Sequence, residues 1–147
     1  MKKALIETYY TTDNGYHPFF IREHWQVAQL NYLSWLSFTT IERVERHEHT
    51  DEIFVLTKGK AVLIGADIKE ERVSFECILM QPGVTYNIPI NTWHTIAMDE
   101  ETEIIIVEKS NTHLCDCHYH SLTDEDQNKL RDQILELVSE LNVLNNG

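Results

Sequence analysis

A chain of 147 residues suits one domain, 1–147, and its 42% content of hydrophobic residues is enough for a sizeable core. Its 24 acidic residues against 12 basic ones give a net charge of −12. This balance argues against a nucleic-acid partner and against binding to an anionic membrane surface, because both need clustered cations. Solubility is the simplest explanation of the acidity.

The first residues, MKKALIETYYTTDNG, contain an apolar stretch too short for the core of a signal peptide. No stretch of the sequence approaches the length of a membrane span. The cysteine count is low and odd, with Cys77, Cys115 and Cys117. We therefore expect a cytoplasmic protein with reduced thiols.

Alternating apolar and polar residues predict strands through most of the chain. Residues 25–33 (WQVAQLNYL) and 37–45 (SFTTIERVE) alternate, and the second is rich in β-branched residues. Residues 52–65 (EIFVLTKGKAVLIG) read as a hairpin in which Gly59 supplies a positive φ. Further strands are expected at residues 73–80, 92–98 and 102–110, with a turn at Pro82-Gly83. Six or seven short strands indicate an all-β sandwich or barrel.

The C-terminal segment has a different pattern, which predicts one amphipathic helix over about 124–144. Apolar residues recur at helical spacing, at Leu130, Ile134, Leu137, Val138, Leu141 and Leu144. Thr123 fits the N-cap, and three acidic residues follow it in the first turn, where the helix dipole favours anions. We expect the apolar stripe to pack on the barrel or on a second subunit.

Two segments in the middle of the chain resemble the paired motifs of the cupin superfamily. The segment ERHEHTDEIFVLTKG (residues 45–59) holds the Glu52-to-Gly59 spacing of the first motif. The segment GVTYNIPINTWH (residues 83–94) holds Gly83, Pro89 and His94 in the register of the second. The resemblance covers about residues 40–110. It implies a double-stranded β-helix (jelly-roll) barrel with its core at about 25–110, and a divalent metal held by histidines and a glutamate.

The first motif is shorter than the family pattern, since only two residues separate His49 from Glu52. Two registers resolve the difference. In one, His47 and His49 are the two motif histidines and the turn to Glu52 is tight. In the other, the spacing to Glu52 is kept, His47 takes the second histidine position and Glu45 the first. Both registers keep His47, Glu52 and His94, and histidine as the commoner metal ligand favours His49 over Glu45.

Three other positions depart from the family pattern. Ile41 stands where the first motif has Gly, Asn91 replaces the Gly of Pro-x-Gly, and Met98 stands where Asn is usual. Asn91 is tolerable because asparagine adopts the left-handed region more readily than most residues. The ligand set suits Fe, Mn, Ni, Zn or Cu, and the sequence does not choose among them.

Several side chains in the same region are candidates to contact a small ligand. Phe54, Tyr86 and Met98 are expected to line the barrel interior beside Glu45. Trp93, next to His94 on a regular strand, should face away from the metal and toward packing or a subunit contact.

A second group of possible metal ligands lies in HLCDCHYH, with Cys115, Cys117, His118 and His120. Zinc sites usually separate their ligand pairs by a loop, and this spacing does not. Alternation would put the cysteines on one face and the histidines on the other. We interpret the segment as a polar edge leading to the helix, with weak adventitious metal binding as a hazard for experiments.

Three functions are compatible with these patterns. The first is a metal-dependent enzyme, an oxygenase, isomerase or lyase, acting on a small polar metabolite. The second is a non-catalytic barrel that binds a small, sugar-like molecule without metal. The third is a structural dimer with a filled barrel. A homodimer is expected from the resemblance and from EIIIVE (residues 103–108), if that apolar strand lies at a sheet edge.

Overall fold

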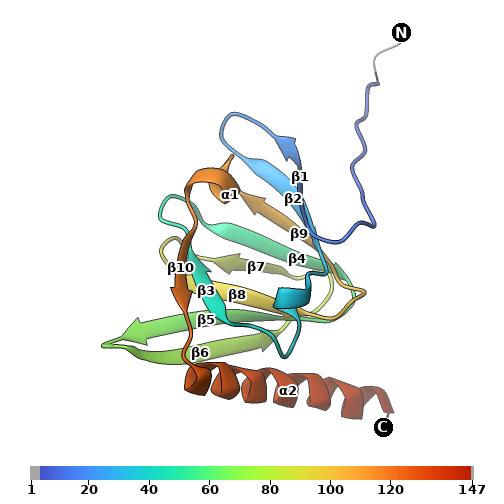
Figure 1. Cartoon of the computed structure of the whole chain (residues 1–147). Helices are drawn as coiled ribbons and strands as arrows, with labels where there is room; N and C mark the ends of the chain where they lie inside the picture. The colour runs from blue at the N-terminus through green and yellow to red at the C-terminus, as the bar shows by residue number, and fades with distance from the viewer. Residues whose placement is uncertain (1–3, 147) are drawn as a thin grey trace.

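The computed structural model describes residues 4–146 and the side chains of residues 4–140. It contains two five-stranded antiparallel sheets (Figure 1). The first sheet has the order β1 (Tyr16–Ile21), β2 (Gln26–Asn31), β9 (Glu103–Glu108), β4 (Glu52–Lys58) and β7 (Thr85–Ile88). The second has the order β10 (His118–Ser121), β3 (Arg43–Arg46), β8 (Trp93–Met98), β5 (Ala61–Lys69) and β6 (Arg72–Leu79). The all-β prediction is confirmed.

The main hydrophobic core lies between the two sheets and follows from alternation along the strands. In β4, Phe54 and Leu56 are buried, while Val55 between them is only half-buried. In β9, Ile104 and Ile106 are buried in the same way. Because strand side chains alternate faces, every second residue of each strand points into the core, and this holds up to the glutamate at the strand's end. That end carries Glu52 in β4 and Glu108 in β9, and both carboxyl groups are buried.

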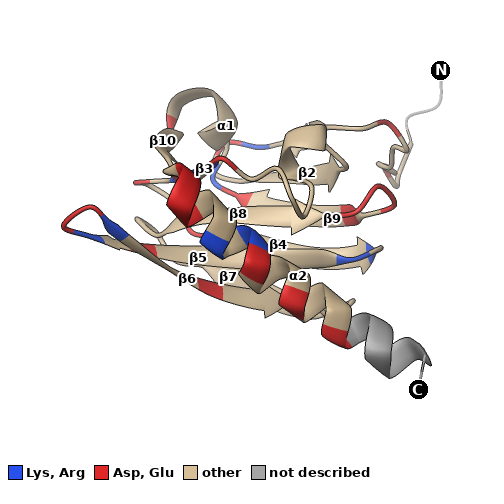
Figure 2. Cartoon of the chain, turned by 60° about the horizontal axis from the view of Figure 1, so that its bottom comes forward, with Lys and Arg blue, Asp and Glu red and all other residues tan. Residues whose placement is uncertain are grey.

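A second core forms where α2 (Asp124–Asn146) covers the outer face of the second sheet, alongside β6 (Figure 1). Leu130 and Ile134 are fully buried there against Val62, Ile64 and Val73. The opposite face of the helix carries charged residues (Figure 2). The predicted helix and its packing on the barrel are confirmed; of the predicted stripe, the side chains of residues 141 and 144 lie outside those described.

The predicted N-cap is also present, since the backbone N–H of Asp126 donates to Thr123 Oγ1 at 3.2 Å. Two short helices complete the fold, the 3₁₀ helix η1 (Ser34–Leu36) and α1 (Thr112–Cys115). Within the described part of the chain, no helix is both long enough and apolar enough to cross a bilayer.

The predicted hairpin at residues 52–65 is wrong, because β4 and β5 belong to different sheets. The turn between them has the expected positive φ at Gly59, 86°. A Cβ at Gly59 would lie 2.5 Å from Thr102 Cα, and the Thr102 hydroxyl donates to Lys60 O at 2.8 Å. The turn is therefore fixed to the connection between β8 and β9 and carries the chain from one sheet to the other.

The expectation that residues 103–108 form an edge strand is also wrong. Strand β9 is the central strand of the first sheet and pairs with β2 on one side and β4 on the other. Its apolar composition reflects burial within one subunit, so it gives no reason to expect a dimer through this strand.

Three strands of the structure were not predicted, and several predicted strands, β2, β3 and β9 among them, are shorter than expected. Strand β1 contains Pro18 within an irregular pairing, as suits an edge strand, while β7 and β10 each have four residues. Strand β3 contains only the last three of the predicted residues 37–45, together with Arg46. Strand β2 contains six of the predicted residues 25–33.

Candidate metal centre

Four side chains from three strands bring their ligand atoms together at one end of the space between the sheets. Glu45 lies on β3, His47 directly follows β3, Glu52 begins β4 and His94 lies on β8. Their ligand atoms all lie within 4.8 Å of one another, and all but Glu45 are buried. Pairing brings them together, since Glu45 is opposite His94 between β3 and β8. This buried His/Glu cluster resembles a metal site.

His47 is held at both ring nitrogens. Its Nδ1–H donates to the backbone carbonyl of Asp116 at 2.7 Å, and its Nε2 lies 2.7 Å from Glu52 Oε2. The second contact is a hydrogen bond between ring and carboxylate. An outer partner at Nδ1 fixes the orientation of the ring and directs Nε2 toward the cluster, as in many metal-binding histidines.

His94 is oriented in the same way, but its inner nitrogen has no hydrogen-bond partner. Its Nδ1–H donates to Thr92 O at 2.8 Å. Its Nε2 is buried, 3.6 Å from Glu52 Oε2 and 3.8 Å from Glu45 Oε1, beyond hydrogen-bonding distance. An unsatisfied buried polar atom is costly, so this nitrogen indicates a site for a ligand or an ion.

The charges within the cluster are strongly coupled. Burial favours the neutral form of Glu52, but the hydrogen bond from His47 and the nearness of His94 outweigh it and lower the pKa of Glu52 to about 2. Burial opposes the charge on His47, yet Cys117 and Glu52 raise its pKa to about 12. Burial and the Glu52 charge raise the pKa of Glu45. These shifts favour an imidazolium at His47 paired with a carboxylate at Glu52.

The backbone around the cluster explains which register of the first motif is adopted. Asp116 accepts the backbone N–H groups of Glu48 and His49, both at 2.9 Å, so the segment after β3 turns there. The His49 side chain is exposed and is not among the four converging residues. The arrangement is that of the second register, in which Glu45 and His47 precede Glu52.

The turn before His94 contains a residue in the left-handed conformation, which asparagine adopts more readily than most residues. Asn91 has a φ of 63°, in the left-handed region, and its N–H donates to His47 O at 2.8 Å. The second motif is thereby tied directly to the first.

Glu108 is a site residue that sequence reasoning missed. It pairs with Glu52 across β4 and β9, and its Oε1 accepts hydrogen bonds from Tyr16 OH at 2.7 Å and Gln26 Nε2 at 3.3 Å. Burial and the charge of Glu52 raise the pKa of Glu108 to about 8. The available signal was an acidic residue on the inward row of EIIIVE, in line with Ile104 and Ile106.

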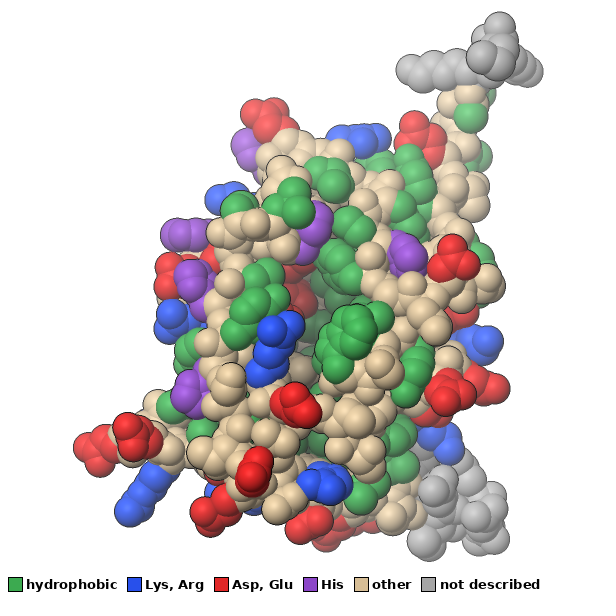
Figure 3. Space-filling view, viewed as in Figure 1, with side chains coloured by type: hydrophobic (Ala, Val, Ile, Leu, Met, Phe, Trp, Pro, Cys, Tyr) green, Lys and Arg blue, Asp and Glu red, His purple; other side chains and the backbone are tan. Residues whose placement is uncertain are grey.

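A cavity of about 500 Å³ opens from the cluster to the surface. Figure 3 shows this face of the molecule hollowed, with acidic side chains in the depth and hydrophobic ones around them. Its apolar wall includes Leu30, Leu33, Leu36, Phe54, Ile96 and Ile106. At the rim, Trp35 is 58% exposed and Tyr119 51% exposed, and the Arg43 guanidinium lies 3.9 Å from the centre of the Tyr119 ring.

Of the three side chains predicted to contact a ligand beside Glu45, one lines the cavity and two do not. Phe54 lines the cavity, and its ring meets that of His94 edge to face with centroids 6.2 Å apart. Met98 is fully buried in the core, and Tyr86 packs against that core with its hydroxyl accepting the N–H of Gln81. Neither Met98 nor Tyr86 is among the residues lining the cavity. Trp93 faces away from the cluster, as expected, and packs in the second core.

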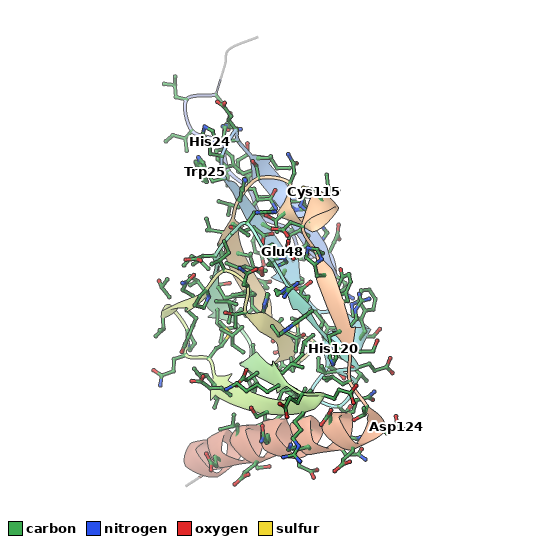
Figure 4. The ribbon with its side chains drawn as sticks, turned by 90° about the vertical axis from the view of Figure 1, so that its left-hand side faces the viewer. His24, Trp25, Glu48, Cys115, His120 and Asp124 are labelled. Atoms are coloured by element: carbon green, nitrogen blue, oxygen red, sulfur yellow. The ribbon has the colours of Figure 1, made fainter. Side chains whose placement is uncertain are left out.

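The cysteine and histidine residues of 115–120 do not converge. Cys115 lies exposed on α1, whereas His120 lies further along β10, toward Asp124 at the start of α2 (Figure 4). His120 contacts the Trp93 ring, and Cys117 lines the cavity near His47. Among the described residues, the only converging group of potential metal ligands is the one at Glu45, His47, Glu52 and His94.

The thiols should differ in reactivity. Cys115 is exposed and should react first with an aromatic disulfide reagent at pH 8. Cys77 should react last, because burial and the nearby Glu76 raise its pKa to about 11. Single-cysteine variants followed by absorbance would measure the rates. Protection of Cys115 that a chelator removes would contradict the finding that the cysteine and histidine side chains of residues 115–120 do not converge.

Comparisons with known proteins support the fold. No protein-family model matches the sequence, and no curated protein matches it significantly. A Bacillus halodurans structure is 14% identical over 74% of this chain and 78% of its own, with a TM-score of 0.51. A cupin-2 domain containing protein from Shewanella frigidimarina is 20% identical over 68% and 84%, with a TM-score of 0.47. An RmlC-like cupin family protein with a double-stranded β-helix fold, from Methanocaldococcus jannaschii, is 12% identical over 77% and 94%, with a TM-score of 0.46.

At such identities the likeness concerns the fold alone. Together with the two antiparallel sheets, the likeness to the Bacillus halodurans structure supports a fold of two facing antiparallel sheets, covered on one outer face by a C-terminal helix.

Proposed function

We propose that this protein binds a divalent metal ion through Glu45, His47, Glu52 and His94, and that the adjoining cavity admits a small organic molecule beside the ion. The observation that carries the proposal is His94 Nε2, a buried nitrogen that faces two carboxylates and has no hydrogen-bond partner. A cation at this point would be bound by the nitrogen. It would also reduce the electrostatic repulsion between the two carboxylates.

His94 and its two carboxylate neighbours fit such an ion in distance, and the four residues together fit it in charge. Ligands about 2.1 Å from one ion lie no more than about 4.2 Å apart. The His94–Glu52 and His94–Glu45 distances of 3.6 and 3.8 Å meet this limit. The two carboxylates neutralise the charge of a divalent ion, and two neutral imidazoles add no charge to the site. The set suits Fe, Mn, Ni, Zn or Cu, because imidazole or carboxylate ligands are compatible with each of them.

A bound ion with an accessible coordination position would supply a Lewis acid at the base of the cavity. The chain's own residues prepare this place. Asp116 and Thr92 accept the Nδ1–H groups of the two histidines and direct both Nε2 atoms inward. The apolar wall lowers the local dielectric constant and so strengthens the electrostatic interactions of a polar group bound beside the cluster. We propose a metal-dependent enzyme on this basis.

A binding barrel without metal is the second candidate, and one contact favours it. The direct His47–Glu52 hydrogen bond, at 2.7 Å, satisfies two of the four groups without any ion. Metal binding must displace the proton between them. A protein in which this bond persists would bind its ligand in the cavity through side chains alone.

Metal content decides between the two candidates. Tag-free wild-type protein, reconstituted separately with Fe, Mn, Ni, Zn and Cu, should hold about one equivalent of at least one metal by plasma mass spectrometry. The His94→Ala variant should hold none. His49→Ala is the matched control, since this histidine lies two positions from His47, is exposed and does not join the cluster. It should keep its metal.

Three results would contradict the metal proposal. Wild-type protein that takes up none of the five metals would leave the metal-free barrel. Metal retained by His94→Ala would lie elsewhere in the chain. Metal lost from His49→Ala but retained by Glu45→Gln would favour the first register of the motif and contradict the proposed ligand set.

A further inference from the structure

The side chains of β3 that face the cavity run from the cluster to the mouth. Val44 is fully buried in the second core, on the outer face of the sheet, so the residues on either side of it, Arg43 and Glu45, face inward. Glu45 belongs to the cluster, and both residues line the cavity. The rise of a strand places Arg43 about 7 Å from Glu45 along β3. Arg43 is exposed, so a guanidinium lies at the mouth of the cavity, in line with a proposed metal ligand.

The Arg43 guanidinium lies over an aromatic ring. It is 3.9 Å from the centre of the Tyr119 ring, and Tyr119 is paired with Glu45 across β10 and β3, so it faces the cavity as well. In the described part of the chain, this guanidinium has no hydrogen bond and no ion pair. Contact with the ring limits the positions of the side chain and leaves its N–H donors accessible. A carboxylate matches such a planar group, because it accepts two parallel hydrogen bonds.

The mouth and the wall around it suit an apolar body. The rings of Trp35 and Tyr119 are exposed at the rim, and Figure 3 shows hydrophobic side chains and a basic one around the hollow. Aliphatic and aromatic side chains, Phe54 and Ile96 among them, line the cavity between the rim and the cluster. A ligand would bury its apolar part against them and cover the two exposed rings. A molecule that fills this space therefore needs an apolar body with a polar group near Arg43.

The other charged groups around the cavity leave few charges uncompensated. Among the described residues, four glutamates and three histidines line it besides Arg43: Glu42, Glu45, Glu52, Glu108, His47, His94 and His113. A divalent ion offsets Glu45 and Glu52, whereas without it the imidazolium of His47 offsets Glu52 alone. Burial and the charge of Glu52 raise the pKa of Glu108 to about 8, which favours its neutral form at pH 7. The exposed Glu42 remains, so a carboxylate with one negative charge meets less repulsion than a phosphate with nearly two.

We propose that Arg43 is a specificity-determining residue, and that the cavity takes amphipathic carboxylates whose carboxylate accepts hydrogen bonds from the Arg43 guanidinium while the apolar body lies along the wall. This inference rests on the proposed function, because it assigns a ligand class to the same cavity. The end of the molecule opposite the carboxylate then points toward the cluster, where Glu45 lies on the same face of β3 as Arg43.

Two probes of nearly the same shape test the proposal, 4-phenylbutyrate and its neutral amide, 4-phenylbutyramide. Each is titrated at pH 7 into metal-loaded and metal-free protein by calorimetry or protein-observed NMR. At this pH the carboxyl group is ionised. We expect metal-loaded wild-type protein to bind the acid about fivefold more tightly than the amide, as one exposed charge-assisted pair supports. The acid should also displace the amide, because both occupy one site.

Two variants separate the guanidinium at the cavity from one elsewhere on the surface. Arg43→Gln removes the charge at the mouth, so the acid should lose about threefold or more in affinity and the amide less than about twofold. Arg22→Gln is the matched control, because its guanidinium also lies 3.9 Å from the centre of an aromatic ring, that of Phe20, but outside the cavity. It should keep the wild-type affinities. Metal content measured on the same samples should be equal in Arg43→Gln and wild type.

Each contrary outcome has a distinct meaning. If wild-type protein binds the acid and the amide equally, binds neither, or binds both at once, the inference is overturned. An acid that binds Arg43→Gln as tightly as wild type places its carboxylate elsewhere, which overturns the inference and leaves the metal proposal intact. An equal loss in Arg22→Gln would assign the preference to net charge and overturn the inference too. Wild-type protein that takes up no metal but prefers the acid through Arg43 would defeat the metal proposal and support the inference.

Discussion

Replacing Asp116 with alanine should destabilise the protein by about 2–4 kcal/mol and weaken metal binding by about 10- to 100-fold. The carboxylate accepts the backbone N–H groups of Glu48 and His49, both at 2.9 Å, and alanine would leave these donors unpaired in a partly buried turn. The same residue's carbonyl accepts His47 Nδ1–H at 2.7 Å. A displaced backbone would therefore also change the direction of the His47 ring.

Urea denaturation of metal-free protein would measure the first effect, and competition with a metal indicator the second. Asp67→Ala is the control, because Asp67 is exposed on β5 and its partner is the exposed Lys69. It should change the free energy of unfolding by less than about 0.5 kcal/mol. Equal stability of Asp116→Ala and Asp67→Ala would show that the two backbone hydrogen bonds do not stabilise the turn.

The stability effect of Asp116→Ala should depend on pH in one direction. Burial opposes ionisation of Asp116, but the N–H donors of Glu48 and His49 outweigh it and lower the pKa of the carboxyl. A carboxyl with a lowered pKa stabilises the folded state fully above its ordinary pKa, and this contribution is lost as the pH falls through the lowered value. The difference between wild type and variant should therefore be constant near neutral pH and shrink in acid. A difference that grows in acid would contradict this assignment.

Much of the fold could be predicted because most strands alternate and the helix repeats its apolar residues at helical spacing. Pairing partners could not. A glycine turn between two apolar runs is compatible with a hairpin or with a crossing between sheets, and only the contact of Gly59 with Thr102, far along the chain, decides between them. The same holds for EIIIVE, whose apolar sequence suits a central strand as well as an edge.

The residues of the candidate site that belong to a motif could be predicted from the spacing of that motif. The residues whose position depends on contacts with distant parts of the chain could not. His47, Glu52 and His94 follow from the two motif segments and converge in the structure. The choice between Glu45 and His49 depends on Asp116, which turns the chain after His47 from a position almost seventy residues later. Glu108 was missed because its alternation with Ile104 and Ile106 was read as an edge strand, not as an inward row that ends in a carboxylate.

Replacing Ile134 with alanine should destabilise the protein by about 2–4 kcal/mol without changing its metal content. Ile134 is fully buried in the second core, where α2 covers the outer face of the sheet that contains β5 and β6. Removing its methyl groups leaves a space that rigid strands cannot close. Leu135→Ala is the matched control, because the neighbouring side chain is 39% exposed and should cost less than about 1 kcal/mol.

Denaturant unfolding and metal analysis of both variants would check this prediction. The metal should be retained because Glu45 and His94 face the space between the sheets, whereas Ile134 contacts the opposite face of the second sheet. Loss of metal from a folded Ile134→Ala protein would mean that α2 positions the cluster through β8, whose His94 and Ile96 face the cavity while Ala97 lies in the second core. A variant as stable as wild type would show that packing of this helix on its own barrel contributes little, and would direct attention to a second copy of the chain as its partner.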